Sequence, residues 1–94
     1  MKDVRTIING VLYSTKDSKV ILKGTYYYGL KKYPCISYKT TSGKFFCTKI
    51  LPDGMIITEV LTETQMKELI EESFGQNVTD EQIEKYVRLF GELD

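Results

Sequence analysis

The sequence contains no histidine, and this absence excludes more chemistry than any other feature of the composition. Histidine is the commonest general base, the usual partner of a catalytic serine or cysteine, and a frequent zinc ligand. The chain also lacks a glycine-rich phosphate loop, because its glycines have neither the required spacing nor a helix directly after them. We therefore expect a protein that is not an enzyme, has no catalytic residues and binds no metal or cofactor.

Cysteine is scarce as well, since only Cys35 and Cys47 occur. Two cysteines are too few for a disulfide framework, and they cannot supply the four ligands of a structural zinc site. The first residues, MKDVRTIING, have no apolar core with a cleavage site, so we expect a cytoplasmic protein with reduced thiols. No run approaches the roughly 18 apolar residues of a membrane span, so no membrane partner is expected.

The chain carries 13 basic and 13 acidic side chains, but the two signs are segregated along it. Residues 16–52 contain eight lysines and one acid, whereas residues 53–94 contain eleven acids and three basic residues. This division can produce a dipolar surface that orients a charged partner. It can equally arise from solvated lysines on a sheet and solvated glutamates on helices. The composition leaves both interpretations open.

The first half of the chain carries the signals of β-strands. Asn9-Gly10 separates two apolar, β-branched segments, and this dipeptide is the strongest short hairpin signal because both positions adopt positive φ. Pro34 cannot donate a ladder hydrogen bond, so the following strand is expected to begin just after it, behind a loop at 29–34. Gly24 indicates a bulge or the close approach of another backbone within a strand at 20–28.

A second hairpin surrounds Ser42-Gly43, and its register can be argued from side-chain character. A two-residue turn would pair Tyr38 with Cys47 and mix lysine with isoleucine on each face. A three-residue loop with Gly43 in the left-handed region pairs Ser37 with Cys47 and separates apolar from polar side chains more cleanly. We predict this second register. It directs Ile36, Tyr38, Phe46 and Ile50 inward and Lys39, Phe45, Cys47 and Lys49 outward, with Cys35 and Cys47 diagonal neighbours on the outer face.

Two helices are predicted after a strand at 55–60. Each begins with a threonine followed three residues later by glutamine, the pattern of a capping box, and each ends at a glycine suited to a left-handed C-cap. These residues are Thr62, Gln65 and Gly75 in the first helix, and Thr79, Gln82 and Gly91 in the second. Both helices have one apolar stripe, and the sheet is the available surface on which to bury it.

The predicted fold is therefore α+β. It consists of a mostly antiparallel sheet of about five strands, containing two hairpins, with two C-terminal helices packed on it. A chain of 94 residues is expected to form a single domain, 1–94, with a β-rich part at 1–60 and a two-helix part at 61–94.

Four short motifs occur in one order along the chain. They are Ile8-Asn9-Gly10-x-Leu12-Tyr13-x-Thr15, Tyr38-Lys39-Thr40-x-Ser42-Gly43-Lys44-Phe45-Phe46, Leu61-Thr62-Glu63 with Lys67-Glu68, and Glu84-Lys85-Tyr86 with Phe90-Gly91. Together they resemble a group of small proteins carried by phages and conjugative elements of Gram-positive bacteria. Gene neighbourhoods of this group include inhibitors of host defence, among them anti-CRISPR proteins. Members tend to carry a glycine- and acid-rich segment after the aromatic strand of the second hairpin, where this chain has CTKILP (47–52).

The resemblance implies a non-enzymatic inhibitor of a bacterial defence system that acts by stoichiometric contact with a host protein, such as a nuclease or a nucleoprotein complex. Aromatic side chains rimmed by lysines fit the anchors of a protein interface. Lysines interleaved with aromatic rings also fit a surface for RNA or single-stranded DNA, which is the alternative function. The candidate partner-binding residues are Lys31, Lys32, Lys39, Phe45, Cys47 and Lys49.

Overall fold

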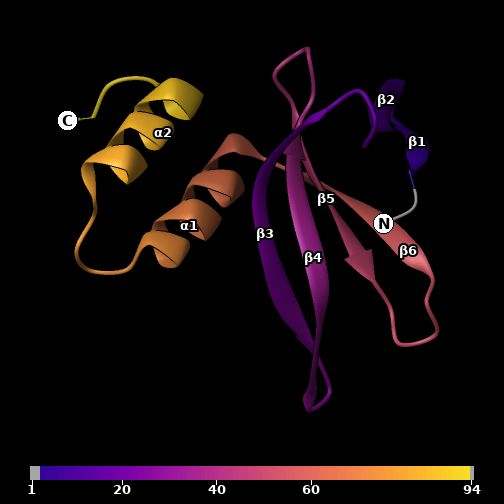
Figure 1. Cartoon of the computed structure of the whole chain (residues 1–94). Coiled ribbons are helices and arrows are strands. Elements are labelled where there is room, and N and C mark those ends of the chain that lie inside the picture. Colours follow the sequence, from indigo (N-terminus) through magenta and orange to yellow (C-terminus); the bar gives the residue numbers. More distant parts are fainter. Residues whose placement is uncertain (1–2, 94) are drawn as a thin grey trace. The chain divides into compact units, whose positions relative to one another are not determined.

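The computed structural model of the chain describes residues 3–93. The chain divides into two compact units, Met1–Thr62 and Glu63–Asp94, which we call the strand unit and the helix unit. Within the described residues, six strands are followed by two helices (Figure 1). The elements are β1 (Arg5–Ile8), β2 (Val11–Ser14), β3 (Lys19–Tyr28), β4 (Lys31–Lys39), β5 (Phe45–Ile50), β6 (Ile56–Leu61), α1 (Glu63–Phe74) and α2 (Asp80–Phe90).

The α+β class with antiparallel strands, predicted from the sequence, is confirmed. The strands of residues 3–93 form two sheets, a four-stranded sheet in the order β3-β4-β5-β6 and a separate pair, β1-β2. The sequence predicts about five strands in one sheet, and the difference arises because the first hairpin pairs only with itself. The packing of the two helices on the sheet stays a prediction.

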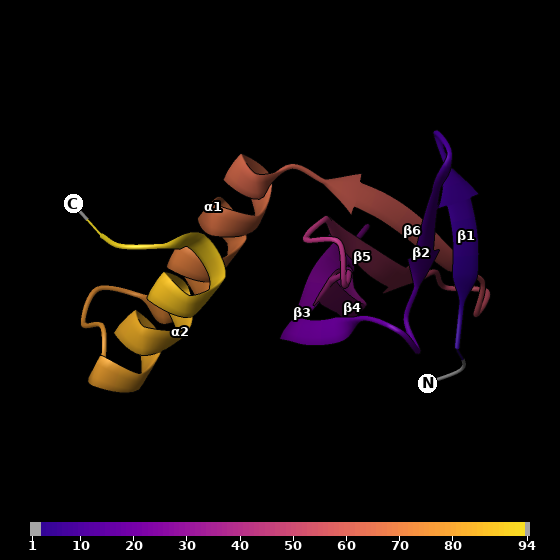
Figure 2. The same cartoon turned by 90° about the horizontal axis from the view of Figure 1, so that it is seen from above.

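The first hairpin forms where Asn9-Gly10 predicts it. Asn9 and Gly10 have φ values of 50° and 77°, the left-handed conformation that a two-residue turn between antiparallel strands requires. The hairpin lies beside the four-stranded sheet (Figure 2). It contacts the sheet through side chains: the Tyr13 ring packs edge-on against Phe46 at 5.3 Å between centroids. The Phe46 ring also stacks on Tyr38 at 5.0 Å, which completes the aromatic core of the strand unit.

The register of the β4–β5 hairpin is confirmed. Ser37 pairs with Cys47, as the three-residue loop predicts, and Gly43 has a φ of 87°. The Gly43 amide donates to the Thr40 carbonyl at 3.0 Å, and the Thr40 amide donates to the Lys44 carbonyl at 2.8 Å. The turn chemistry and the alternation of side chains therefore specify the same pairing, which is why the sequence predicts it correctly.

Phe45 and Cys47 lie on the predicted face of β5, opposite Phe46, but their predicted exposure to solvent is wrong. Phe45 is 6 % exposed and Cys47 is 2 % exposed, so these side chains are as buried as Phe46 and Thr48 on the opposite face of β5. The prediction assumed that the face bearing cysteine, serine and lysine lies in water. Cysteine is in fact among the residue types most often buried in proteins. Strand β5 is thus buried on both faces.

Strand β4 begins at Lys31, earlier than predicted, and continues through Pro34. The expected loop at 29–34 is therefore wrong, and a tight turn at Gly29, with a φ of 66°, joins β3 to β4. Strand β5 pairs with β4 only as far as Cys35, so Pro34 has no β5 partner that would need its missing amide hydrogen. The bulge expected at Gly24 lies between Val20 and Leu22 instead.

The helix unit begins at Glu63, directly after the predicted capping residue Thr62. The predicted capping box of the second helix is confirmed: the Gln82 amide donates to Thr79 Oγ1 at 3.2 Å, and the Thr79 amide donates to Gln82 Oε1 at 3.0 Å. The Tyr86 ring lies 6.5 Å from the Phe74 ring, and its hydroxyl donates to Glu71 at 2.9 Å. In the part of the chain that the structure describes, neither helix is long and apolar enough to cross a membrane.

Candidate functional site

The β3–β4 hairpin extends beyond the rest of its sheet. Strand β5 pairs with β4 only between Cys35 and Lys39, whereas β3 and β4 stay paired up to Tyr28 and Lys31. Residues 25–34, which we call the hairpin end, therefore form a two-stranded ribbon with no third strand beside it. In Figure 1 this end lies at the bottom of the sheet and reaches past the end of β5. Both faces of the ribbon are available to solvent or a partner.

Aromatic side chains occupy both faces of the hairpin end. On one face, Lys32 Nζ lies 5.4 Å from the centre of the Tyr27 ring, a cation–π contact between cross-strand partners. On the other face, the Tyr33 ring lies 6.1 Å from Tyr26 and 6.5 Å from Tyr28. These contacts hold the rings in defined positions, and two of the rings stay exposed, Tyr27 at 68 % and Tyr28 at 60 %.

The turn of the hairpin end adds an apolar side chain and two positive charges. Leu30 is 100 % exposed, which makes it the most exposed large apolar side chain among residues 3–93. Lys31 and Lys32 follow it directly and are exposed as well. An unburied leucine between tyrosines and lysines contributes nothing to the core of the strand unit, and it lies in one exposed group with Tyr27 and Tyr28.

Only Lys31 and Lys32 of the six predicted partner-binding residues lie at the hairpin end. Phe45 and Cys47 are buried, and their predicted exposure is corrected above. Lys39 is half-buried, with its Nζ 5.6 Å from the centre of the Phe45 ring. The six residues therefore do not form one surface, and Lys31 and Lys32 are the members that stay accessible.

Lys49, the sixth predicted residue, is engaged within the strand unit. Its Nζ lies 2.9 Å from Glu59 Oε2 on β6 and 5.3 Å from the centre of the Tyr26 ring on β3. The hydrogen bond to Glu59 raises the pKa of Lys49. The Tyr26 hydroxyl in turn donates to the Ile50 carbonyl at 2.6 Å, and burial raises the pKa of Tyr26. Lys49 thus links three strands on one face of the sheet.

A cysteine pair lies on the same face as Lys49. Cys35 on β4 is opposite Lys49, and Cys47 on β5 is opposite both Ser37 and Glu59, so the two cysteines are diagonal neighbours, as predicted. Both are free thiols joined by a side-chain hydrogen bond. This hydrogen bond from Cys47 lowers the pKa of Cys35 to about 7 and raises the pKa of Cys47. We call Cys35, Cys47, Lys49 and Glu59 the thiol cluster.

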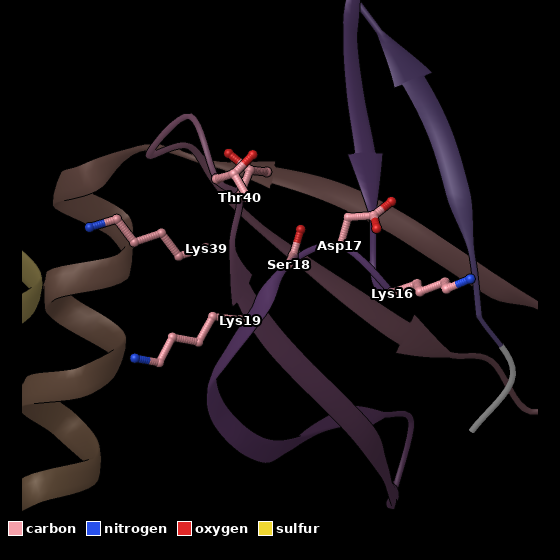
Figure 3. A pocket seen from close by; sticks show the side chains of 7 residues that line it. Lys16, Asp17, Ser18, Lys19, Lys39 and Thr40 are labelled. Atoms are coloured by element: carbon pink, nitrogen blue, oxygen red, sulfur yellow. The ribbon is translucent and has the colours of Figure 1, made fainter.

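Lys39 also borders a pocket of about 420 Å³ at the start of β3 (Figure 3). Lys19 and Lys39 are cross-strand partners, an arrangement that is unfavourable for two like charges. Their side chains extend to one side of the pocket, whereas Lys16 points to the opposite side (Figure 3). The three ammonium groups therefore do not converge on one point, as they would around a bound anion.

The sequence interpretation missed Tyr28 and Leu30 at the hairpin end and Glu59 in the thiol cluster. A signal for the first two was present, because glycine at the first position of a two-residue turn is typical of a hairpin. The sequence interpretation gave more weight to Pro34 and therefore predicted a loop at 29–34. No local signal identifies Glu59, since its contact with Lys49 depends on the pairing of β5 with β6.

The described residues, 3–93, contain no group of three or more cysteine or acidic side chains that could hold a metal ion. The chemistry that the site does offer is of two kinds. The hairpin end presents exposed rings and ammonium groups, which suit binding, and the thiol cluster presents an ionisable sulfur. Comparison of the chain with protein-family models, curated proteins and solved structures gives no match.

Proposed function

We propose that this chain is a non-enzymatic binding protein that contacts a host protein through the hairpin end. The observation that carries the proposal is the exposed group of Tyr27, Tyr28 and Leu30, flanked by Lys31 and Lys32, on a ribbon that extends beyond the sheet. Tyrosine supplies large contact area with few rotatable bonds, and interface hot spots are enriched in it.

The chemistry of the hairpin end indicates the kind of surface that would accept it. Leu30 and the tyrosine rings require an apolar depression, and the two lysines favour an acidic rim around it. A narrow ribbon can enter a cleft that a flat sheet cannot, because only its two strands need to be accommodated. Clefts with acidic residues occur in nucleases that bind metal ions through carboxylates.

The resemblance to small proteins of phages and conjugative elements supplies the biological context of the proposal. Such a protein acts as an inhibitor of a bacterial defence system by stoichiometric contact, in the manner of an anti-CRISPR protein. A cytoplasmic host nuclease, or a nucleoprotein complex that contains one, is the proposed target. Inhibition through the hairpin end requires no catalytic group in the inhibitor, which agrees with the absence of histidine.

The test is a capture experiment with the complete chain immobilised and a lysate of a Gram-positive host. The proposal expects recovery of a defence-system protein by the unmodified chain and its loss with the double substitution Tyr27→Ala and Leu30→Ala. Both side chains are exposed, so their removal should leave the free energy of unfolding, measured by urea titration, within about 0.5 kcal/mol of the original. Phe45→Ala is unsuitable as a probe, because it removes a buried ring.

A matched control separates specific contact from general charge attraction. Lys31→Glu with Lys32→Glu should release the target, whereas Lys16→Glu with Lys44→Glu, which makes the same change in net charge at other exposed positions, should retain it. Retention of the target by the Tyr27→Ala, Leu30→Ala variant contradicts the proposed surface. Capture of no defence protein, combined with no protection of phage from a host defence system, contradicts the proposed target.

Binding of RNA or single-stranded DNA is a second candidate function, favoured by the Tyr27–Lys32 pair. An exposed ring beside an ammonium group can stack on a base while the lysine contacts a phosphate. This function predicts a mobility shift with an oligonucleotide at low salt that weakens steeply as salt rises, and that Lys31→Glu with Lys32→Glu abolishes. Absence of any shift at low salt contradicts it.

A further inference from the structure

We propose that Cys35 and Cys47 form a peroxide-reactive dithiol site, in which the Cys35 sulfur attacks a hydroperoxide and Cys47 then closes an intramolecular disulfide. The site lies outside the hairpin end, and the inference is independent of the binding function proposed above. It assigns different roles to the two cysteines, and each role follows from the position of the residue in the sheet.

The sheet brings the two sulfurs together although twelve positions separate the cysteines in the chain. Cys35 pairs with Lys49 and Cys47 pairs with Ser37, so the cysteines project from the same face of β4 and β5 as diagonal neighbours. Diagonal neighbours across an antiparallel pair lie about 7–8 Å apart at their Cα atoms, so closing a disulfide requires a small approach of β4 and β5. Each thiol is the largest influence on the pKa of the other, which agrees with their places as neighbours on this face.

Access to solvent distinguishes the two sulfurs. Cys47 is 2 % exposed, whereas Cys35 is only half-buried. The residue opposite Cys35 on β3 is Gly24, which is exposed. Because glycine has no side chain, the space beside it is open: a Cβ added there would have no atom within 4 Å. A small peroxide can therefore approach Cys35 over Gly24, while Cys47 stays protected. This difference in access makes Cys35 the attacking thiol and Cys47 the resolving thiol.

The neighbours of Cys35 favour its thiolate, which is the nucleophilic form. The largest contribution is the hydrogen bond from Cys47, which lowers the pKa of Cys35 to about 7 against the opposing effect of burial. The ammonium group of Lys49 also lowers this pKa, and the carboxylate of Glu59 opposes it. Tyr26 faces the same group from β3 and is neutral at pH 7, because a tyrosine hydroxyl has a pKa of about 10 and burial raises the Tyr26 pKa further. The Cys35 thiolate is thus populated near pH 7, where a cysteine without these neighbours is mostly protonated.

The reaction consumes one molecule of hydrogen peroxide. The Cys35 thiolate attacks one peroxide oxygen, an S–O bond forms, and the O–O bond breaks to release hydroxide, which takes a proton from solvent and becomes water. The Cys47 sulfur then attacks the sulfur of the Cys35 sulfenic acid, and the hydroxyl group leaves with the Cys47 thiol proton as a second water. Two thiols are oxidised to one disulfide, and the peroxide is reduced to two waters.

The loss of the Cys35 thiolate in the first step assists the second. The thiolate is what raises the pKa of Cys47, because the hydrogen bond between them keeps the Cys47 proton in place. Conversion of Cys35 to a neutral sulfenic acid removes this constraint, and Cys47 ionises more readily as it attacks. The pair is therefore suited to sequential reaction, first at Cys35 and then at Cys47.

The test treats the complete reduced chain with hydrogen peroxide at pH 7 and follows the intact mass and tryptic peptides. The expected product is a monomer lighter by two hydrogen atoms, with a peptide that links Cys35 to Cys47 and is cleaved by a thiol reductant. Cys47→Ser cannot close the disulfide, and it should accumulate a sulfenic acid at Cys35 that dimedone traps. Cys35→Ser should show no modification at Cys47 under the same conditions.

Two substitutions on β3 test the proposed access path. Gly24→Val places a side chain in the open space opposite Cys35 and should slow the peroxide reaction several-fold. Thr25→Val places valine at the neighbouring position, which faces the opposite side of the sheet, and should leave the rate unchanged. Intermolecular dimers as the main product, a stable sulfenic acid in the unmodified chain, or a Cys35 rate no faster than that of glutathione would each overturn the proposal.

Discussion

Cys35 and Cys47 are the same side chain in two surroundings, and the surroundings decide their chemistry. One proton is shared in a hydrogen bond between them, so ionisation of Cys35 is favoured and ionisation of Cys47 is opposed. Lys49 is the cross-strand partner of Cys35, and its ammonium group lowers the pKa of both thiols. A cysteine in a peptide without these neighbours would show neither shift.

The pH dependence of alkylation follows from this arrangement. The thiolate is the reactive form, and a pKa of about 7 for Cys35 predicts that its rate with iodoacetamide rises with pH to a plateau, with the midpoint near pH 7 rather than near 9. Cys47→Ala removes the hydrogen-bond donor, so the thiolate is less stabilised and the midpoint should move upward. Cys47→Ser retains a donor and should keep the midpoint low. The same midpoint in all three chains contradicts the hydrogen bond as the cause.

At the level of the elements, two glycines of the same sheet have opposite requirements. Gly43 ends the β4–β5 loop with a φ of 87°, a conformation that residues with a side chain rarely adopt. Gly24 lies within β3 without a positive φ, and a side chain added there would meet open space. The first glycine is needed for the turn, whereas the second is needed only if something must approach Cys35.

Alanine at these two positions should therefore change stability in opposite directions. Gly43→Ala forces a side chain into the left-handed region and should lower the free energy of unfolding by about 1–2 kcal/mol. Gly24→Ala removes flexibility from the unfolded chain without strain in the folded one, and should raise it by up to about 1 kcal/mol. Urea titration followed by circular dichroism measures both. A loss of stability with Gly24→Ala as large as that with Gly43→Ala contradicts this account.

For the whole molecule, the two units carry opposite net charge. Residues 1–62 contain ten basic and four acidic side chains, a net charge of +6, and residues 63–94 contain three basic and nine acidic side chains, a net charge of −6. The change of sign read from the sequence lies between residues 52 and 53, ten residues before the boundary between the strand unit and the helix unit. The net charge of zero for the whole chain therefore describes the charge of neither unit.

Ion-exchange behaviour should show this division. A chain with zero net charge at pH 7 would pass through a cation exchanger if only the total mattered, but the strand unit should hold it on the resin at low salt. Lys31→Glu with Lys32→Glu should lower the salt concentration needed for elution. Passage of the unmodified chain through the resin at low salt contradicts a surface dominated by the basic strand unit.

Local features were predictable because each is decided within a few residues. The Asn9-Gly10 turn, the β4–β5 register and the capping box at Thr79 all depend on the φ preference of a residue or on a hydrogen bond spanning three positions. The course of β4 through Pro34 was not predictable, because it depends on where β5 stops pairing. The burial of Phe45 and Cys47 was not predictable either, because the alternation of side chains along a strand does not show which face of the sheet becomes covered.

The sequence by itself determined the strand and helix signals, the antiparallel pairing of its hairpins and the segregation of charge, because turn conformation, side-chain period and charge are properties of short segments. Only the tertiary structure decided which candidate residues reach solvent. It left Lys31 and Lys32 exposed on a ribbon without a third strand, and it joined Cys35, Cys47, Lys49 and Glu59 across three strands. These relations depend on the lengths over which neighbouring strands pair, and strand pairing brings together residues that are distant in the chain.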